Sequence, residues 1–314
     1  CIRDSLHPDV LRPPSRCLSP GEEAKRRFAT MRPMQVSISA RPQAVAALSR
    51  LESVLADLEH RVIACSGGID SLVLATVAHR AAPDSTVVAH TVTPDVPGDG
   101  TARVADYAAR EGWDLRIVRS GEFDDEAYLA NPVDRCYHCK SNLYDAVDAI
   151  RDVSGVVLSG ANLDDLGEFR PGLAAAEERS VRHPYVEAQV TKLEIRAIAR
   201  QLGLADADLP ASPCLASRLY TGTRVTPTRL RAVEAGETFV RQRTGIAVVR
   251  CRVLDTTVLV EVPDADRELV SGDLVADLTE LMSTVEPTIT SVALDDRPYA
   301  PGRSFVAAAN SVAP

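Results

Sequence analysis

The chain has 314 residues, of which 45% are hydrophobic and 25% are charged. This composition is typical of a soluble globular protein, and the length suffices for one large domain or two moderate ones. No apolar run approaches the roughly 20 residues that cross a bilayer, so we expect no membrane segment. The net charge of −9 argues against a nucleic acid as partner, because nucleic-acid-binding domains are usually basic.

The start of the chain differs in composition from the rest. Residues 1–40 include a stretch rich in proline and basic residues without the apolar core of a secretory signal, so we expect a disordered extension. The next segment, 41–60, has apolar residues at helical spacing and predicts a helix. Seven cysteines are an odd number in a chain too large to need disulfides. They predict reduced thiols and a cytoplasmic protein.

A glycine-rich stretch, Ser66-Gly67-Gly68-Ile69-Asp70-Ser71, lies between an apolar run at 61–65 and a helical pattern at 72–78. Glycine lets the backbone approach a phosphate closely, and the free N–H groups of a helix N-terminus attract negative charge. The hydroxyls of Ser66 and Ser71 add donors, so the stretch predicts a phosphate-binding loop. It is not a Walker loop, because a Walker loop needs the longer spacing Gly-x4-Gly-Lys-Ser/Thr and a lysine. A turn that merely joins strand to helix is the alternative.

Strands and helices continue to alternate after this loop. Strands are predicted at 86–92, 115–118 and 155–159, and helices at 101–112 and 134–152. This order predicts an α/β fold with a parallel sheet covered on both faces. Such sheets bind ligands at the carboxyl ends of their strands, where the loop at Ser66 lies. Asp164 follows the last of these strands and is a candidate magnesium or ribose contact, with capping of its loop as the alternative.

The helix predicted at 134–152 opens with a Cys-x-x-Cys pair, Cys136 and Cys139. In the first turn of a helix, the dipole and Arg135 or Lys140 would lower the pKa of both thiols and favour thiolate. Thiolates bind zinc or iron–sulfur clusters, or act as nucleophiles. A redox pair, half of a zinc site and two unconnected thiols all remain open for this pair alone.

A third thiol lies in the proline-rich segment around Cys214. Pro210 and Pro213 force an extended approach to it, which predicts a thiol presented on a loop. Arg218 follows closely and can hold an anion through two hydrogen bonds.

The order of the predicted elements changes beyond about residue 225. A helix is followed by strands at 247–253 and 257–262, a helix at 265–282 and a strand at 288–294. This order predicts a small α+β unit. We therefore expect an ATP-binding domain at 41–222, a small α+β domain for substrate binding and oligomerisation at 223–305, and a tail at 306–314. A capping box at 191–194 predicts the start of a helix in the first domain.

The glycine-rich stretch resembles the pyrophosphate loop of the ATP pyrophosphatase superfamily. Enzymes of this superfamily cleave ATP between its α and β phosphates, adenylate a substrate oxygen and release pyrophosphate. The resemblance implies that Ser66, Gly67, Gly68, Asp70 and Ser71 bind ATP, and that Asp70 helps to hold Mg²⁺.

Four motifs in their chain order resemble the LarE family, the ATP-dependent sulfur transferases that make the nickel-pincer cofactor of lactate racemase. They are the pyrophosphate loop, the segment 135–140, the segment 159–165 with Arg-Pro-Gly at 170–172, and the segment 213–218. The resemblance covers residues 41–305. It implies adenylation of a carboxylate of pyridinium-3,5-biscarboxylic acid mononucleotide, replacement of an oxygen by sulfur to give a thiocarboxylate, and a homo-oligomer.

Members of this family differ in their sulfur source. Some have a single cysteine, matching Cys214, which gives up its sulfur and becomes dehydroalanine. Others have three cysteines that hold a [4Fe–4S] cluster with one non-protein ligand. This chain has all three cysteines, Cys136, Cys139 and Cys214, so we expect the cluster form. Three protein thiolates leave one iron position open for an extra sulfide that can be transferred, whereas a fourth would block it. Its partners would include a sulfide source or iron–sulfur assembly proteins.

The resemblance also implies substrate contacts from Ser217, Arg218, Arg250 and Glu261. Arg250 and Glu261 stand on neighbouring predicted strands, and Arg252 is the alternative to Arg250. Charged residues on a solvated strand are the other interpretation. The closing arginine motif of the family is altered here, so that its arginine is either lost or moved to Arg303.

Two other functions remain. A tRNA thiolase of the same superfamily would show a basic groove or an RNA-binding module, and this acidic chain shows neither. A non-catalytic iron–sulfur or metal-binding protein with a relic ATP loop is disfavoured because the loop from Ser66 to Ser71 is intact. Release of pyrophosphate from ATP distinguishes the enzymes from the binding protein.

Overall fold

The computed structural model describes residues 40–151, 155–167 and 170–304. The chain divides into residues 1–40 and 41–314. The extension predicted at 1–40 lies outside the described residues, apart from Ala40, where the first described helix begins. The tail predicted at 306–314 also lies outside them.

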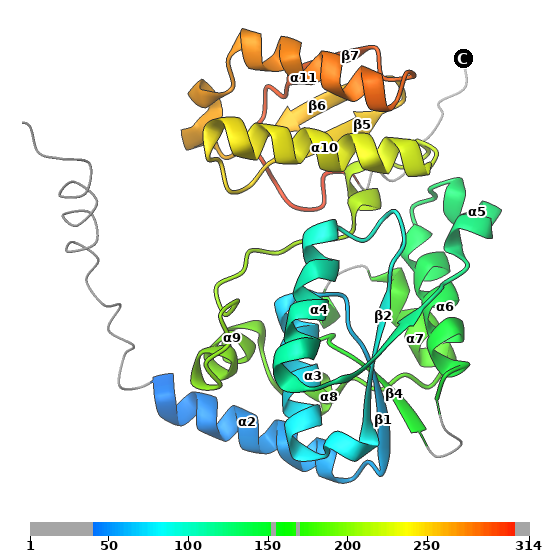
Figure 1. The fold of residues 1–314 in the computed structure, drawn as a ribbon, viewed down its shortest axis with the longest axis vertical. Coiled ribbons are helices and arrows are strands. Elements are labelled where there is room, and N and C mark those ends of the chain that lie inside the picture. Colours follow the sequence, from blue (N-terminus) through cyan, green and yellow to red (C-terminus); the bar gives the residue numbers. More distant parts are fainter. Residues whose placement is uncertain (1–39, 152–154, 168–169, 305–314) are drawn as a thin grey trace, which may run out of the picture. The chain divides into compact units, whose positions relative to one another are not determined.

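A parallel sheet of four strands follows the first helix (Figure 1). The strand order is β3-β2-β1-β4, and each neighbouring pair is parallel. This confirms the predicted α/β architecture with a parallel sheet. Strands β2 and β3 lie on one side of β1 and β4 lies on the other, so the chain's direction of winding reverses at β1. Such a switch point is where open α/β sheets bind ligands. The strands are β1 (His60–Ala64), β2 (Thr86–Thr91), β3 (Asp114–Val118) and β4 (Gly155–Ser159).

Helices cover both faces of this sheet (Figure 1). Val62 and Ile63 of β1 point to opposite faces, as successive strand residues do, and each joins a different apolar core. The core around Ile63 includes residues of α2 (Ala40–Ala56), α3 (Ile69–Ala81), α4 (Gly98–Glu111), α8 (Pro184–Glu187) and α9 (Lys192–Gln201). The core around Val62 includes residues of α6 (Arg135–Asp148) and α7 (Pro171–Glu178). The short helix α5 (Glu126–Leu129) precedes α6.

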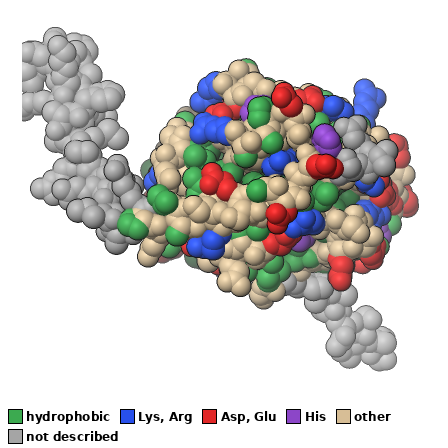
Figure 2. Space-filling view, turned by 90° about the horizontal axis from the view of Figure 1, so that it is seen from below, with side chains coloured by type: hydrophobic (Ala, Val, Ile, Leu, Met, Phe, Trp, Pro, Cys, Tyr) green, Lys and Arg blue, Asp and Glu red, His purple; other side chains and the backbone are tan. Residues whose placement is uncertain are grey.

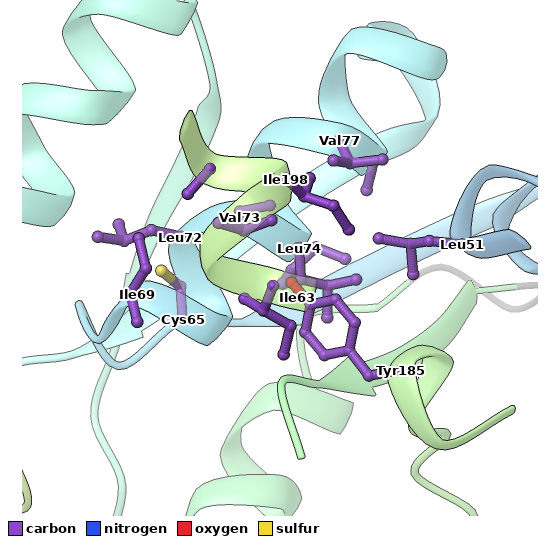
Figure 3. Packing of buried hydrophobic residues seen from close by; sticks show 14 of the residues in the cluster. Leu51, Ile63, Cys65, Ile69, Leu72, Val73, Leu74, Val77, Tyr185 and Ile198 are labelled. Atoms are coloured by element: carbon purple, nitrogen blue, oxygen red, sulfur yellow. The ribbon is translucent and has the colours of Figure 1, made fainter. Parts of the chain in front are cut away.

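Helix α3, which follows the predicted phosphate loop, is buried along most of its length. Figure 3 shows Leu72 and Leu74 of α3 packed among Ile63, Tyr185 and Ile198 from the surrounding elements. A helix that is apolar on all sides is held rigidly by its neighbours. Truncating the fully buried Leu74 to alanine would cost about 2–5 kcal/mol. The core therefore fixes the position of the loop at the start of α3.

The second sheet has three strands in the order β5-β6-β7, with an antiparallel and a parallel pair. Its elements are α10 (Pro227–Thr244), β5 (Arg250–Leu254), β6 (Thr257–Glu261), α11 (Gly272–Val285) and β7 (Ser291–Leu294). They share one apolar core, which also includes Leu215 and Leu219 from the loop after Cys214. The loop that carries Cys214 is thereby anchored on the second sheet.

The prediction of a single helix at 265–282 is wrong at the N-terminal end. A 3₁₀ turn spans Asp264–Leu269, and α11 begins only at Gly272. Ser271 interrupts the run, because its side chain accepts a hydrogen bond from the N–H of Leu274 and caps a new helix. No helix among the described residues is long and apolar enough to cross a membrane.

Candidate active site

The predicted phosphate loop follows β1 at the carboxyl edge of the parallel sheet. Gly67 has a left-handed backbone with φ of 78°. A Cβ atom at Gly67 would lie 2.8 Å from the carbonyl carbon of Gly100, so only glycine fits there. Helix α3 begins two residues later with Gly68 as its N-cap, so no N-cap side chain binds the N–H groups of its first turn.

Protein hydrogen bonds hold the loop in shape. The Ser71 hydroxyl accepts from the N–H of Ser66 at 3.1 Å and donates to the carbonyl of Gly68 at 3.0 Å. From β2, the buried His90 places Nδ1 2.8 Å from the carbonyl oxygen of Cys65. The loop conformation is therefore fixed by the protein itself, which lowers the entropic cost of binding a phosphate.

Asp70 lies in the first turn of α3 and forms an ion pair with Lys192, whose Nζ contacts both carboxylate oxygens. The carbonyl of Asp70 accepts a hydrogen bond from the Tyr185 hydroxyl at 2.8 Å. Burial raises the pKa of the Asp70 carboxyl, and Lys192 offsets this only in part. A magnesium ion at this carboxylate would compete with the ammonium of Lys192.

Asp164 lies in the loop after β4, next to the same residues. Its carboxylate accepts a hydrogen bond from the N–H of Lys192 at 2.6 Å. The two loops pack closely, since a Cβ atom at Gly160 would lie 3.0 Å from the backbone nitrogen of Ser71. The structure thus brings Asp70 and Asp164 together with Lys192 at the switch point of the sheet.

Sequence reasoning missed Lys192. The capping box was predicted correctly, with Thr191 and Glu194 bonded to each other at the start of α9. It indicates a helix start and says nothing about the lysine, whose carboxylate partner Asp70 is 122 residues away. The only available signal was a lysine at the N-terminal end of a helix, where the helix dipole disfavours it.

The three candidate thiols lie near one another. Cys136 and Cys139 are in the first turns of α6, and Cys214 precedes the 3₁₀ turn Leu215–Arg218. All three are free and partly exposed. Burial raises the pKa of Cys214, and the nearby Cys136 raises it further. Burial also raises the pKa of Cys139, and Cys214 adds to this increase. The thiols are therefore within electrostatic reach of one another.

Asp95 links this group to the sheet, and sequence reasoning missed it as well. Its buried carboxylate accepts hydrogen bonds from the hydroxyls of Thr93 at 2.6 Å and Tyr128 at 3.1 Å. Its carbonyl accepts from the N–H of Leu215 at 2.7 Å. Asp95 thereby holds the loop that carries Cys214 against the segment that leads from β2 to α4.

Two cations accompany the thiols. The buried Arg135 donates to the carbonyl of Ala216 at 2.8 Å. Burial lowers the pKa of Arg135, but negative charge on the thiols, first on Cys214, outweighs it and raises the pKa. Burial likewise lowers the pKa of Lys140, and anionic neighbours including Cys139 reverse the direction. Both side chains would compensate negative charge on thiolates.

The prediction of lowered thiol pKa values is wrong for Cys139. Burial raises its pKa well above the ordinary value, and Lys140 lowers it by less. The pKa of Cys214 is also raised by burial, although Arg135 acts in the opposite direction. The sequence shows which charges lie near a thiol in the chain but not how deeply the thiol is buried. Here desolvation raises the two pKa values by more than the nearby cations lower them. Both thiols keep their protons at neutral pH unless a metal binds the thiolate.

Among the described residues, no three His, Cys, Asp or Glu side chains are placed to hold one metal ion. Thiolates are the ligands of iron–sulfur clusters, so the chemistry of Cys136, Cys139 and Cys214, with Arg135 and Lys140 beside them, is compatible with such a cluster.

Arg218 is buried and bound within the protein. Its guanidinium makes two hydrogen bonds to the Glu237 carboxylate, at 2.9 and 3.0 Å. It also donates to the carbonyls of Pro213 and Cys214, so it shapes the loop of the third thiol. The hydroxyl of Ser217 lies 3.2 Å from the same guanidinium. Substrate contacts from Arg218 and Ser217 stay a prediction.

Arg250 and Glu261 face each other in the β5–β6 register but have different partners. Glu261 is fully buried and pairs with Arg252 at 3.1 Å and with Arg303 at 3.0 Å. Arg250 donates to the carbonyl of Ala211 at 3.1 Å and forms no ion pair with any described carboxylate. Arg250, more than Arg252, is thus available to an anion.

Arg250 lines a cavity of about 160 Å³. Arg103 lines the cavity and donates to the carbonyl of Gly67 at 3.0 Å. Burial lowers the pKa of Arg250, and the positive charge of Arg218 lowers it further. An anionic group in this cavity would relieve that repulsion.

No family model matches the chain, but curated proteins are similar to it. An uncharacterised protein of Synechocystis sp. is 35% identical over 241 residues, which cover 76% of this chain and 89% of that protein. An uncharacterised protein of Methanocaldococcus jannaschii is 27% identical over 205 residues, 65% of this chain and 77% of that protein.

A relative of known activity comes from Lactiplantibacillus plantarum. This pyridinium-3,5-bisthiocarboxylic acid mononucleotide synthase is 30% identical over 218 residues, which cover 68% of this chain and 79% of the synthase. The identity extends over most of both chains. The protein therefore belongs to the family of pyridinium-3,5-bisthiocarboxylic acid mononucleotide synthase, the LarE family that its motifs resemble.

Proposed function

We propose that the protein is an ATP-dependent sulfur transferase that converts a carboxylate of pyridinium-3,5-biscarboxylic acid mononucleotide into a thiocarboxylate, with AMP and pyrophosphate as products. The name of the L. plantarum relative supports this substrate class. One observation carries the proposal. The stretch from Asp95 to Gly100, which leads from β2 into the first turn of α4, contacts both parts of the site, since Gly100 packs against Gly67 and Asp95 binds the residue after Cys214.

The phosphates of ATP would bind at the loop from Ser66 to Ser71, at the N-terminus of α3. A carboxylate oxygen of the substrate attacks the α-phosphorus, the bond to the bridging oxygen breaks, and pyrophosphate leaves. The resulting acyl-adenylate has AMP as leaving group in place of oxide. Arg250 and Arg103 line the adjoining cavity and would hold the anionic substrate in position for this attack.

Magnesium would be held by Asp70, with Asp164 nearby and ATP phosphates completing its ligands. When bound, the ion would neutralise charge on the departing pyrophosphate. In the structure, the ammonium of Lys192 forms an ion pair with the Asp70 carboxylate. Released from Asp70, its ammonium would donate to a phosphate oxygen. The three side chains lie together at the switch point, which supports this assignment.

The sulfur would come from a [4Fe–4S] cluster held by Cys136, Cys139 and Cys214, with one iron free of protein ligands. When bound, the cluster would carry an extra sulfide, renewed from a sulfide source, that replaces the carboxylate oxygen. Asp95 and Arg135 hold the loop around Cys214 in place. A sulfide source or an iron–sulfur assembly protein of the cytoplasm would be the partner. The alternative source is the sulfur of Cys214 itself.

We infer an ATP domain at 41–222 and a smaller α+β domain at 223–305, which would bind the substrate and form homo-oligomer contacts. The β5–β6–β7 sheet and its two helices support this division. The core of the smaller part also takes in Leu215 and Leu219, so the two parts are joined by packing as well as by the chain.

The test is pyrophosphate release from ATP by anaerobically reconstituted protein, with and without the mononucleotide. We expect release that depends on the mononucleotide, and its loss in Asp70→Asn. The matched control is Asp106→Asn, which changes an exposed ion pair with Arg110 in the same way. Release that requires tRNA instead would indicate a tRNA thiolase. No release with either substrate would indicate a binding protein.

A further inference from the structure

A second cavity lies at the opposite edge of the parallel sheet, where the strands begin. Its volume is about 450 Å³, within the range of small-molecule sites. Figure 2 views the molecule from below, the side on which the strands start in Figure 1, and Lys and Arg side chains are scattered among Asp and Glu on this face. The cavity lining includes Arg61 of β1, His79 of α3, and Pro83, Trp113 and Ile150, which follow α3, α4 and α6.

Three buried side chains around this cavity have nitrogens without a hydrogen-bond partner among the described residues. They are Nε and Nη1 of Arg61, Nδ1 of His79 and Nε1 of Trp113. The exposed fractions are 4%, 8% and 7% respectively. Buried polar groups without a partner are rare in native proteins, and several around one cavity indicate that the cavity holds their partner.

The charge of Arg61 is also uncompensated by any ion pair with a described residue. Only its Nη2 is bonded, to the carbonyl of Leu58 at 3.1 Å, and burial lowers the pKa of its guanidinium. The two acidic residues of the lining, Asp84 and Asp114, are exposed, and Asp114 pairs with Arg116 at 2.9 Å. A buried cation without an anion destabilises a fold.

We propose that this cavity binds a small oxyanion, a phosphate or carboxylate, whose oxygens accept hydrogen bonds from Arg61 and Trp113. His79 would donate from Nδ1 in the tautomer that carries its proton there. The apolar walls formed by Pro83 and Ile150 leave room for an organic part of the ligand. The site is independent of the phosphate loop, which lies at the other ends of the same strands.

The chain contains one tryptophan, so Trp113 fluorescence reports on this cavity in the whole protein. Inorganic phosphate and acetate are titrated separately into the wild type, Arg61→Met and the control Arg80→Met. Arg80 is also near the end of α3, but its guanidinium binds Glu111 at the surface, at 2.8 and 2.7 Å. We expect a saturable emission change with one or both anions in the wild type and the control. Arg61→Met should bind at least about tenfold more weakly.

Removing an uncompensated buried charge should leave the melting temperature of Arg61→Met unchanged or higher without anion. Should this variant fail to fold, His79→Leu replaces it in the titration, with weaker binding expected. Phosphate bound at the phosphate loop would act on both variants and the wild type alike. Emission that neither anion changes, or identical titration curves for the wild type and Arg61→Met, would overturn the proposal.

Discussion

Lys192, the first residue of α9, holds the carboxylate of Asp70, the acidic residue of the phosphate loop, through both carboxylate oxygens. Burial raises the pKa of Asp70, so the carboxylate depends on a nearby cation. We interpret Lys192 as the cation that serves the carboxylate until magnesium and ATP bind.

Replacing Lys192 with methionine should raise the pKa of Asp70, because the ammonium lowers it in the wild type. The acidic limb of the pH profile for pyrophosphate release should therefore move to higher pH. The rate should fall about 100-fold, the cost of removing one donor to a developing charge. Lys192→Arg should restore part of the rate. An acidic limb that stays in place in Lys192→Met would count against the pairing.

Gly67→Ala should abolish pyrophosphate release, because its Cβ would meet the backbone of Gly100 in addition to adopting a positive φ. Gly112→Ala is the matched control, since φ there is 73° and nothing lies within 4 Å of the new Cβ. The control should lose only about 1–2 kcal/mol in urea unfolding and keep its activity. Equal losses of stability and activity in the two variants would contradict the close packing of the loop.

The strand, glycine turn and helix of the predicted phosphate loop were predictable because their signal is local. A buried strand, two glycines and a helix start follow one another between 61 and 78, and the structure has them in that order. Lys192 and Asp95 were missed because their partners are distant in the chain. Depth is not visible in a sequence either, which is why Cys139 was expected to have a lowered pKa and has a raised one.

The roles of the predicted substrate residues also depend on partners that are distant in the chain. Arg218 is an arginine beside a candidate thiol, which suggested a substrate contact, but Glu237 on α10 binds its guanidinium. The equally plausible Arg250 lacks a carboxylate partner among the described residues. Nothing within a few residues of Arg218 or Arg250 shows which of the two has a carboxylate partner. That difference arises from the packing of α10, which carries Glu237, against β5.

Glu237→Gln should destabilise the protein by about 3–5 kcal/mol, because it leaves the Arg218 guanidinium buried without a charged partner. The double variant Arg218→Met, Glu237→Leu should regain most of that stability in urea unfolding. If Arg218 also binds substrate, the double variant should fold and yet show a raised KM for the mononucleotide. Additive losses of stability in the double variant would show that the two side chains do not interact.

Alkylation of the protein without cluster should be slow at Cys139 and Cys214. Burial holds both pKa values above the ordinary 9.0, so iodoacetamide should react at pH 8 more slowly than with the unfolded chain, and faster above pH 9. Because the folded-state pKa is the higher one, the thiols' contribution to stability is complete below about pH 9 and is lost as the pH rises further. Peptide mass spectrometry measures both sites, and rapid modification at pH 7 would refute the assignment.

We expect Cys136, Cys139 and Cys214 to act together as a lasting sulfur-transfer centre beside the ATP loop. The most direct test is anaerobic turnover of ATP, pyridinium-3,5-biscarboxylic acid mononucleotide and added inorganic sulfide with reconstituted protein, followed by the intact mass of the chain. We predict several thiocarboxylates per chain, an unchanged mass at Cys214, and loss of product in Cys136→Ser and Cys139→Ser. A single turnover with loss of the elements of H₂S from Cys214 would contradict the claim.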